Sequence, residues 1–269
     1  MLSFPNCKIN LGLRILRRRD DGYHQLETVF YPLPVKDALE TIRSQELTFT
    51  ASGLPIPGDP TDNLCLKAWQ LLKKDLPELP PVQIHLHKHI PMGAGLGGGS
   101  ADGAFMLQLL NKQFHLELST ERLIQYAAQL GSDCPFFIIN KPCLGGGRGE
   151  ELQPIELDLS SYRMALVSPG THIGTAWAFS QCTPSEKGKP VREIIAQPVN
   201  TWAAELVNDF EAAIFPAYPE LKRIKEELYN AGAIYASMTG SGSAFYGIFA
   251  HDAVLPNASL FPGYFFTMM

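Results

Sequence analysis

Hydrophobic and polar residues follow two different spacings along this chain, and the spacing separates predicted strands from predicted helices. Residues 3–16 alternate, with Ile9 and Leu11 on one parity and Lys8 and Asn10 on the other. Alternation with a period of two is typical of a half-buried strand. Similar runs bounded by turn residues predict four more strands, at 26–33, 37–50, 82–90 and 162–168. A strand, a glycine-containing loop and another strand are expected near the end, over 234–250.

Helical spacing appears first at residues 63–75, where Leu64, Ala68 and Leu72 fall on one face. Asp62 or Thr61 just before this segment is a suitable N-terminal cap. The same signals predict three more helices, over about 101–112, 119–131 and 218–231. Because strands and helices occur in both halves, we expect an α+β or α/β enzyme with two lobes. The glycine-rich loop at 144–151 sets the expected domains at 1–150 and 151–269.

Composition narrows the class of protein. The 269 residues are 45% hydrophobic and 18% charged, which is ordinary for a globular protein and argues against disorder. The formal net charge of −5 gives no general attraction for nucleic acid or for an anionic membrane, so neither is expected as a partner. The five cysteines are odd in number and form no CxxC pair, which argues against a zinc knuckle or a disulfide framework. With no signal peptide pattern at the start, we expect a cytoplasmic location.

The strongest chemical signal is a glycine-rich loop between a predicted strand and a predicted helix. It consists of Pro91, Met92, Gly93, Ala94, Gly95, Leu96, Gly97, Gly98, Gly99, Ser100 and Ala101, followed by Asp102. Glycines let the backbone approach a ligand closely, and free amides at the next helix N-terminus attract an anion. This pattern predicts a phosphate-binding loop, although no lysine follows the glycines as the P-loop pattern requires.

A dinucleotide-binding loop is the alternative, because Gly93, Gly95 and Gly98 match GxGxxG and Glu117 lies near the expected acid position. The strand before the loop carries His85 and His87, which suit a fully buried Rossmann strand poorly.

The strand before the glycine loop also raises two separate questions. Its histidines, His85, His87 and His89, share one parity; a solvated strand face explains them better than a metal site does. Lys88 falls on the opposite, apolar parity, and either points into a ligand site or snorkels to the surface.

Three further segments are weak signals one by one. Asp133 in G-S-D-C-P-F-F reads as a cap or turn residue, and becomes a candidate base only beside a phosphate acceptor. Lys8 and Asn10 form K-x-N on the first strand. The segment M-T-G-S-G-S-A at 238–244 could be a tight hairpin.

Taken in order, these motifs resemble those of the GHMP kinases. K-x-N, the long glycine motif, G-S-D-x-P-F-F and T-G-S-G-S occur in the family's sequence, and the resemblance runs from Cys7 to about Phe249. The stretch D-G-Y-H at 21–24 is similar to that of the family's branch acting on a cytidine-diphosphate sugar alcohol in the non-mevalonate isoprenoid route. The family's fold would be α+β, with an N-terminal lobe like ribosomal protein S5 domain 2 and a ferredoxin-like C-terminal lobe.

The resemblance implies transfer of the γ-phosphate of ATP to a tertiary hydroxyl of that substrate. Lys8 and Asp133 would be the catalytic pair, with Asp133 as base and Lys8 as its charge-stabilising partner. The glycine loop from Pro91 to Ala101 would bind ATP, with Asn63 near the nucleotide base. Mg²⁺ is expected with ATP, and Ser100 is its one candidate ligand. Tyr23 and Phe179 would stack on cytosine. Other substrate contacts would come from Asn10, His24, Lys88 and Thr175.

Three other functions stay open at this point. Another GHMP kinase, of the mevalonate or homoserine type, would have no use for the two stacking aromatics. A silent nucleotide- or sugar-binding protein on the same scaffold would not need the base. A dehydrogenase is the most distant. The resemblance leaves both a monomer and a homodimer possible.

Overall fold

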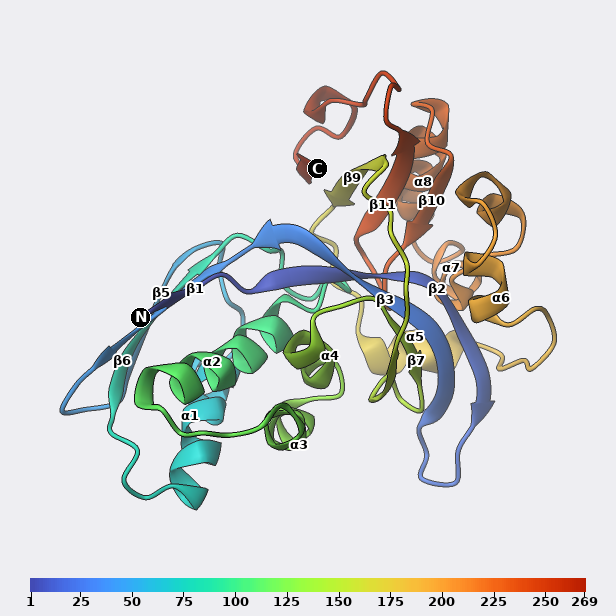
Figure 1. The fold of residues 1–269 in the computed structure, drawn as a ribbon. Coiled ribbons are helices and arrows are strands. Elements are labelled where there is room, and N and C mark those ends of the chain that lie inside the picture. The colour runs from blue at the N-terminus through green and yellow to red at the C-terminus, as the bar shows by residue number, and fades with distance from the viewer. The chain divides into compact units, whose positions relative to one another are not determined.

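The structure is a computed structural model that describes all 269 residues, and it consists of two compact units interleaved along the chain (Figure 1). Unit 1 contains Met1–Lys8, Pro32–Met92 and Gly97–Lys141. Unit 2 contains Ile9–Tyr31, Gly93–Leu96 and Pro142–Met269. This division differs from a single cut at residue 150, because the long strands β2 (Asn6–Arg18) and β3 (His24–Lys36) each contribute residues to both units.

Unit 1 is built on a four-stranded sheet in the order β1-β4-β6-β5. Its strands are β1 (Leu2–Ser3), β4 (Ala38–Arg43), β6 (Val82–Lys88) and β5 (Thr48–Gly53). β6 pairs antiparallel with β4 and parallel with β5. Along β6 buried and exposed residues alternate, so Lys88 lies on the buried parity and His85 on the exposed one. The sequence-based assignment of these two faces is confirmed.

Four helices of unit 1 lie on one side of that sheet (Figure 1). They are α1 (Leu64–Asp75), α2 (Gly98–Phe114), α3 (Thr120–Leu130) and α4 (Cys134–Ile139). Asn63 caps α1, so the expectation of Asp62 or Thr61 in this role is wrong, and Ser119 caps α3. Each side chain accepts a hydrogen bond from a backbone amide of the first turn. α1 buries Ala68 and Leu72 completely, as its periodicity predicts. Burial of one such leucine contributes about 1.5–3 kcal/mol.

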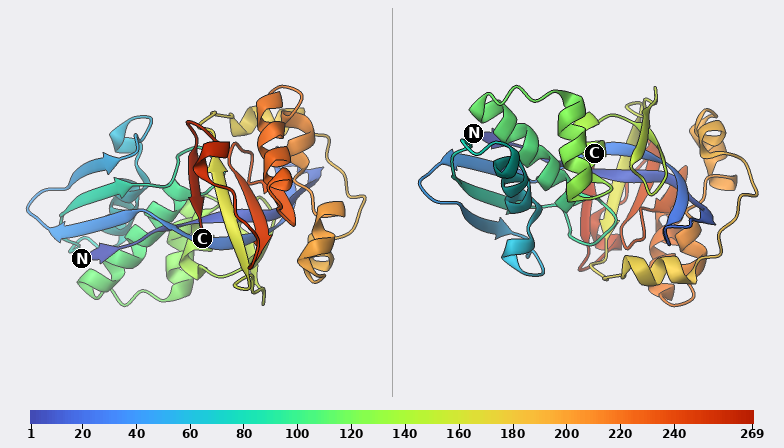
Figure 2. Two further views of the ribbon diagram at one scale, coloured as in Figure 1. Left: turned by 90° about the horizontal axis from the view of Figure 1, so that it is seen from above. Right: turned by 90° about the horizontal axis from the view of Figure 1, so that it is seen from below.

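Unit 2 has an antiparallel sheet in the order β10-β11-β9-β12, with α8 (Pro219–Asn230) packed against it (Figure 2). Its strands are β9 (Tyr162–Ser168), β10 (Tyr235–Met238), β11 (Phe245–Ala250) and β12 (Phe265–Met268). The core between them contains Phe210, Ile224 and Phe245, and it also takes in Leu13 and Leu26 from the first strands of the chain. Unit 2 therefore depends on residues from the start of the sequence.

A second sheet, ordered β2-β3-β7-β8, adds β7 (Cys143–Gly146) and β8 (Glu151–Pro154) in unit 2. Shorter helices complete this unit: α5 (Thr175–Gln181), α6 (Val191–Ile195) and α7 (Asp209–Ile214). Short 3₁₀ helices occur at Pro60–Asp62, Val199–Ala204 and Ala258–Leu260. None of the helices combines the length and apolarity needed to cross a lipid bilayer.

Candidate active site

A lysine and an aspartate that lie far apart in the sequence meet in unit 1. Lys8 Nζ lies 3.4 Å from Asp133 Oδ2. The lysine side chain is 4% exposed and the aspartate side chain 34% exposed. The pair thus has a buried cation and a carboxylate that solvent can still reach, which is the arrangement needed to receive a proton from a ligand.

The carboxylate of Asp133 is not used by the helix that follows it. Asp133 occupies the cap position of α4, yet its side chain makes no capping hydrogen bond. Ser100 comes close from α2, because its side chain hydrogen-bonds Cys134, the next residue after Asp133. Burial raises the pKa of the Cys134 thiol to about 12, so the thiol itself stays protonated. The two sequence motifs G-G-G-S and S-D-C-P are therefore neighbours in space.

The second half of the glycine loop adjoins this pair in unit 1. Gly97 is the N-terminal cap of α2, with a left-handed φ of 70°. A Cβ at Gly97 would lie 2.9 Å from the Phe137 ring and 3.2 Å from Lys8 Cε, so only glycine fits. The first-turn amides of an α-helix have no partner within the helix, and the helix dipole favours an anion there. The start of α2 is thus a suitable phosphate site beside Lys8.

The first half of the loop, Gly93–Leu96, belongs to unit 2 and packs against the T-G-S-G-S segment. A Cβ at Gly95 would lie 2.0 Å from the Thr239 carbonyl oxygen, and Gly95 has a φ of +79°. The Ala244 amide donates to the Ala94 carbonyl at 3.0 Å. The segment predicted as a simple hairpin therefore also holds part of the glycine loop.

Asn10 is fixed by three elements of unit 2 and is 2% exposed. Its amide Nδ2 donates to Thr28 Oγ1 at 3.1 Å, and its backbone N–H donates to Thr239 Oγ1 at 3.0 Å. The Tyr246 hydroxyl donates to the Asn10 carbonyl at 2.8 Å. A substrate contact by Asn10 stays a prediction, and these bonds restrict the positions its side chain can take.

Tyr23 and His24 both lie in unit 2 but meet different neighbours. The Tyr23 side chain is 55% exposed, and the Arg148 guanidinium lies over its ring, 4.7 Å from the centroid. His24 stacks on Phe179, with ring centroids 4.8 Å apart and planes 8° apart. Phe179 therefore faces His24 in this structure, while one face of Tyr23 is covered by Arg148. Stacking of cytosine between the rings of Tyr23 and Phe179 stays a prediction.

Two further residues of the predicted substrate site have partners. Thr175 begins α5, and its hydroxyl lies 3.2 Å from the Ser241 hydroxyl. Burial lowers the pKa of His24 below its usual 6.5, and Arg18 adds a smaller effect in the same direction. His24 is therefore neutral at pH 7 and can both donate and accept a hydrogen bond.

Lys88 is more deeply buried than either sequence-based interpretation suggests. Its ammonium forms ion pairs with Asp37 and Asp102, and its side chain is 0% exposed. Burial alone would lower the Lys88 pKa, but the Asp102 and Asp37 carboxylates outweigh it, so the pKa is raised. Lys88 neither snorkels nor opens to solvent here, and its predicted contact with substrate is untested.

Asn63, predicted near the nucleotide base, has a structural role as well. Its side-chain oxygen accepts from the Cys65 amide at 2.9 Å and caps α1. α1 packs closely on α2, since a Cβ at Gly103 would lie 2.8 Å from Leu64 Cβ. Asn63 is half-buried, and its nucleotide contact stays a prediction.

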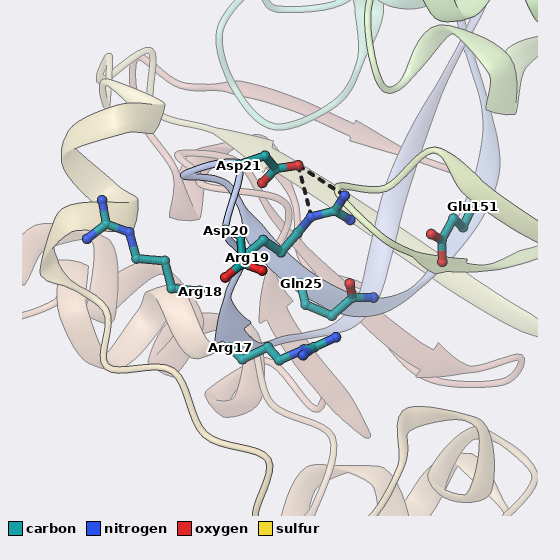
Figure 3. Close-up of a pocket in the computed structure, with 7 residues that line it drawn as sticks. All are labelled: Arg17, Arg18, Arg19, Asp20, Asp21, Gln25 and Glu151. Carbon is teal, nitrogen blue, oxygen red and sulfur yellow. Dashed lines mark hydrogen bonds and ion pairs between the residues drawn. The ribbon is translucent and has the colours of Figure 1, made fainter.

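The arginine-rich turn between β2 and β3 lines a surface hollow of about 470 Å³ (Figure 3). Arg19 is paired with Asp21 at 3.0 Å, and Arg17 and Arg18 point in different directions (Figure 3). Asp21 also accepts a hydrogen bond from the Tyr23 amide at 3.1 Å. The turn therefore shapes the D-G-Y-H stretch, and the three arginines in the lining of the hollow are balanced by Asp20, Asp21 and Glu151.

Sequence reasoning missed several residues that shape this site. Asp37 and Arg148 contact candidate residues across a long sequence separation, and the contact of Thr239, in the T-G-S-G-S motif, with Asn10 was not expected. His172 was also missed, and its ring nitrogen would lie 3.2 Å from a Cβ at Gly93. Asp37 begins the run at 37–50 that was expected to be one strand, so no local signal marked it.

Family comparisons agree on one group of proteins. The family model described as "GHMP kinases N terminal domain" matches residues 63–141, and the one described as "GHMP kinases C terminal" matches residues 192–259. A 4-diphosphocytidyl-2-C-methyl-D-erythritol kinase of Bacteroides fragilis is 53% identical over 256 residues, covering 94% of this chain and 93% of the relative. The kinase of the same name from Cytophaga hutchinsonii is 50% identical over 250 residues, covering 93% of this chain and 92% of the relative.

Solved structures show the same relationship at two levels. A crystal structure of 4-(cytidine 5'-diphospho)-2C-methyl-D-erythritol kinase matches with a TM-score of 0.80 and 32% identity, covering 92% of this chain and 90% of the other. A homoserine kinase from Cytophaga hutchinsonii matches with a TM-score of 0.67 at 15% identity, over 92% of this chain and 86% of the other. The second likeness concerns the fold alone.

Proposed function

Because this chain belongs to the GHMP kinases, we propose that it transfers the γ-phosphate of ATP to the 2-hydroxyl of 4-diphosphocytidyl-2-C-methyl-D-erythritol. One structural observation carries the proposal: Lys8 and Asp133 form an ion pair beside the start of α2. The Asp133 carboxylate is partly exposed and does not cap the helix that follows it. The choice of acceptor rests on relatives of that name that are 53% identical across 94% of the chain.

The proposed reaction assigns a proton transfer to Asp133 and charge stabilisation to Lys8. Asp133 accepts the proton of the attacking hydroxyl, which a carboxylate can do only while it is ionised. Lys8, 3.4 Å away, places its ammonium beside that carboxylate and would offset negative charge on the phosphoryl group during its transfer. Phosphoryl transfer needs little covalent chemistry from the protein, so positioning and charge stabilisation supply most of the rate.

ATP would bind with its phosphates at the glycine loop from Pro91 to Ala101. The amides of Gly98, Gly99 and Ser100 lie in the first turn of α2 and support this assignment. Mg²⁺ fits the site as an ion carried by the nucleotide, because Mg²⁺ needs only one or two protein oxygens beside phosphates and water. Ser100 is the residue that we propose for that contact, and bound Mg²⁺ would neutralise charge on the phosphates.

The cytidine end of the substrate would bind in unit 2. Tyr23 presents an exposed aromatic face, and His24 offers a neutral imidazole to the edge of the base. Phe179 would stack on the opposite face of cytosine once its contact with His24 is exchanged for the base. The arginines at 17–19 would attract the diphosphate.

A mevalonate or homoserine acceptor is the second candidate, and only the fold supports it, at 12–17% identity. We propose that the enzyme is cytoplasmic. Because Lys8 and Asp133 belong to one chain, we also propose that it acts as a monomer or a homodimer.

The test is ADP release from ATP and Mg²⁺ with 4-diphosphocytidyl-2-C-methyl-D-erythritol, beside parallel reactions with mevalonate and homoserine. We expect turnover only with the cytidine substrate. In Asp133→Asn we expect kcat to fall by about 10²–10⁴-fold, the usual contribution of a general base, while ATP still binds. Full activity of this variant would refute the base assignment, and turnover with another acceptor would refute the substrate.

A further inference from the structure

Two carboxylates share one buried ammonium at the base of the glycine loop in unit 1. Lys88 Nζ pairs with Asp37 Oδ2 and, at 2.6 Å, with Asp102 Oδ2. The side chains of the three residues are 0%, 0% and 4% exposed. We call these three residues, Asp37, Lys88 and Asp102, the loop clasp.

The loop clasp reaches both ends of the glycine loop. On the entry side, Asp37 Oδ1 accepts hydrogen bonds from the amides of His89 at 2.6 Å and Ile90 at 2.8 Å, the last two residues before Pro91. On the exit side, Asp102 lies in the first turns of α2. Lys88 joins the two carboxylates, so the backbone before the loop and the helix after it are both linked to the Lys88 ammonium.

The ammonium of Lys88 also lies directly behind the proposed phosphate site. A Cβ at Gly98, the first residue of α2, would lie 3.1 Å from Lys88 Nζ and 2.9 Å from Ile90 Cγ2. Gly98 therefore allows the helix start to rest on the clasp. Because the helix start rests on Lys88, we expect a change in the clasp to shift the amides of Gly98 and Gly99.

A contribution to folding stability alone is a poor explanation for the buried charges of the loop clasp. Buried ion pairs are costly to desolvate, and apolar residues of similar volume are often at least as stable. Here two carboxylates face one ammonium, and Asp102 Oδ1 is buried without a hydrogen-bond partner. The directional bonds to Lys88 and to the loop amides fix a position, which apolar packing would define less sharply.

We propose that Asp37, Lys88 and Asp102 are positioning residues that hold the start of α2 for the nucleotide phosphates. They set the affinity for ATP without touching ATP or the acceptor. This inference rests on the proposed ATP-dependent function, and it gives Lys88 a role other than substrate contact.

The test compares Asp102→Ala with Asp102→Asn in the full-length protein. Calorimetry without acceptor gives the Kd for ATP, and steady-state kinetics gives KM for both substrates and kcat. Asp102→Ala removes the bond to Lys88, and we expect the Kd and KM for ATP to rise about tenfold or more with KM for the cytidine substrate unchanged. Asn keeps an oxygen that can accept from Lys88, so we expect Asp102→Asn to restore ATP affinity to within about threefold of wild type.

Asp75→Asn is the control for a loss of stability in the same unit. Asp75 Oδ2 accepts from Arg122 at 3.0 Å and Tyr126 at 2.8 Å, linking α1 to α3 away from the loop. We expect this variant to lower the melting temperature and leave the Kd for ATP unchanged. If Asp102→Ala does not fold, Asp102→Leu fills the same space and breaks the same bond.

Two outcomes would overturn the proposal. Unchanged ATP affinity in folded Asp102→Ala or Asp102→Leu would make the clasp a stabilising feature only. Equal loss in Asp102→Asn and Asp102→Ala would show that the bond to Lys88 is not what sets affinity. Because ATP binding is measured without acceptor, failure of the proposed acceptor leaves this test intact.

Discussion

Whether a side chain can take part in a reaction depends on whether its polar atoms already form hydrogen bonds that hold the structure together. Asp133 sits where a helix cap would be expected, yet it leaves the helix amides alone and faces Lys8. Asn63 occupies the same kind of position before α1 and does act as a cap. Asp133 and Asn63 thus hold the same position before a helix, yet only Asn63 caps it, and this difference is visible only in three dimensions.

Tyr23 allows a direct test of base stacking. Base stacking on an aromatic side chain contributes about 1–3 kcal/mol, so we expect Tyr23→Ala to raise KM for the cytidine substrate about 5- to 150-fold. KM for ATP should stay within about twofold, because the side chain is 55% exposed and contributes little to the core. Steady-state kinetics with each substrate varied in turn gives both values. Equal increases in the two KM values would contradict a stacking role.

The lowered pKa of His24 predicts a pH dependence for substrate binding. Burial and Arg18 favour neutral imidazole, so His24 takes up its proton only below the usual 6.5. Above that pH the imidazole can accept from the base, and protonation removes this acceptor. We expect KM for the cytidine substrate to be flat from pH 8 down to 6.5 and to rise below it.

The matched variant for this pH profile is His24→Gln, which keeps hydrogen-bonding groups without titrating in this range. Its KM should be independent of pH, and KM for ATP in the wild type serves as the reference. The same shift makes the folded state lose stability as pH falls below 6.5, because the unfolded chain binds the proton first. A rise in KM that persists in His24→Gln would assign the titration to another group.

Among the elements, those with strong periodicity could be predicted and those without it could not. The helices expected at 63–75 and 218–231 appear as Leu64–Asp75 and Pro219–Asn230. The run at 37–50 was expected to be one strand, and it is divided between Ala38–Arg43 and Thr48–Gly53 by a bend. α4 was not predicted, because Cys134–Ile139 spans too few residues to show a helical period.

The candidate site was predictable to the extent that its residues lie in local motifs. Lys8, Asp133 and the glycine loop could be named in advance through the resemblance, and the parity of Lys88 was right. The partners of Lys88 could not be named, since Asp37 is 51 positions earlier and no spacing rule links the two. Partner choice across such distances depends on tertiary packing, which local pattern does not encode.

The contact between the two glycine-rich segments of unit 2 predicts a severe effect for one added methyl group. In Gly95→Ala the new Cβ would lie 2.0 Å from the Thr239 carbonyl oxygen, at a φ of +79°. Strain and overpacking together should cost about 2–5 kcal/mol of stability and most of the activity. Urea denaturation and the ADP-release assay measure the two losses.

Gly232→Ala separates backbone strain from the clash. Gly232 follows α8 with a φ of +94°, and a Cβ there would meet nothing within 4 Å. This variant should lose only about 1–2 kcal/mol, the cost of a left-handed conformation, and keep its activity. If Gly95→Ala were no worse than Gly232→Ala, the close approach to Thr239 would not matter.

At the scale of the whole molecule, each of the two compact units takes segments from several parts of the chain. The family descriptions match residues 63–141, which lie in unit 1 except for Gly93–Leu96, and residues 192–259, which lie in unit 2. Unit 2 nevertheless takes Ile9–Tyr31 from the start of the sequence, and those residues supply Leu13, Ile15 and Leu26 to its core. A boundary drawn from the glycine loop at 144–151 therefore separates a core from part of its own packing.

This division predicts the behaviour of fragments cut at residue 150. A fragment of residues 151–269 would expose the core positions that Leu13, Ile15 and Leu26 cover, and each such side chain contributes about 1.5–3 kcal/mol. The loss approaches the full stability of a typical domain, so we expect this fragment to remain unfolded by circular dichroism and hydrogen exchange. Adding residues 9–31 through a flexible linker should restore folding, because it returns the missing part of the core. A fragment of 151–269 that folds cooperatively by itself would contradict this account and favour a domain boundary at 150.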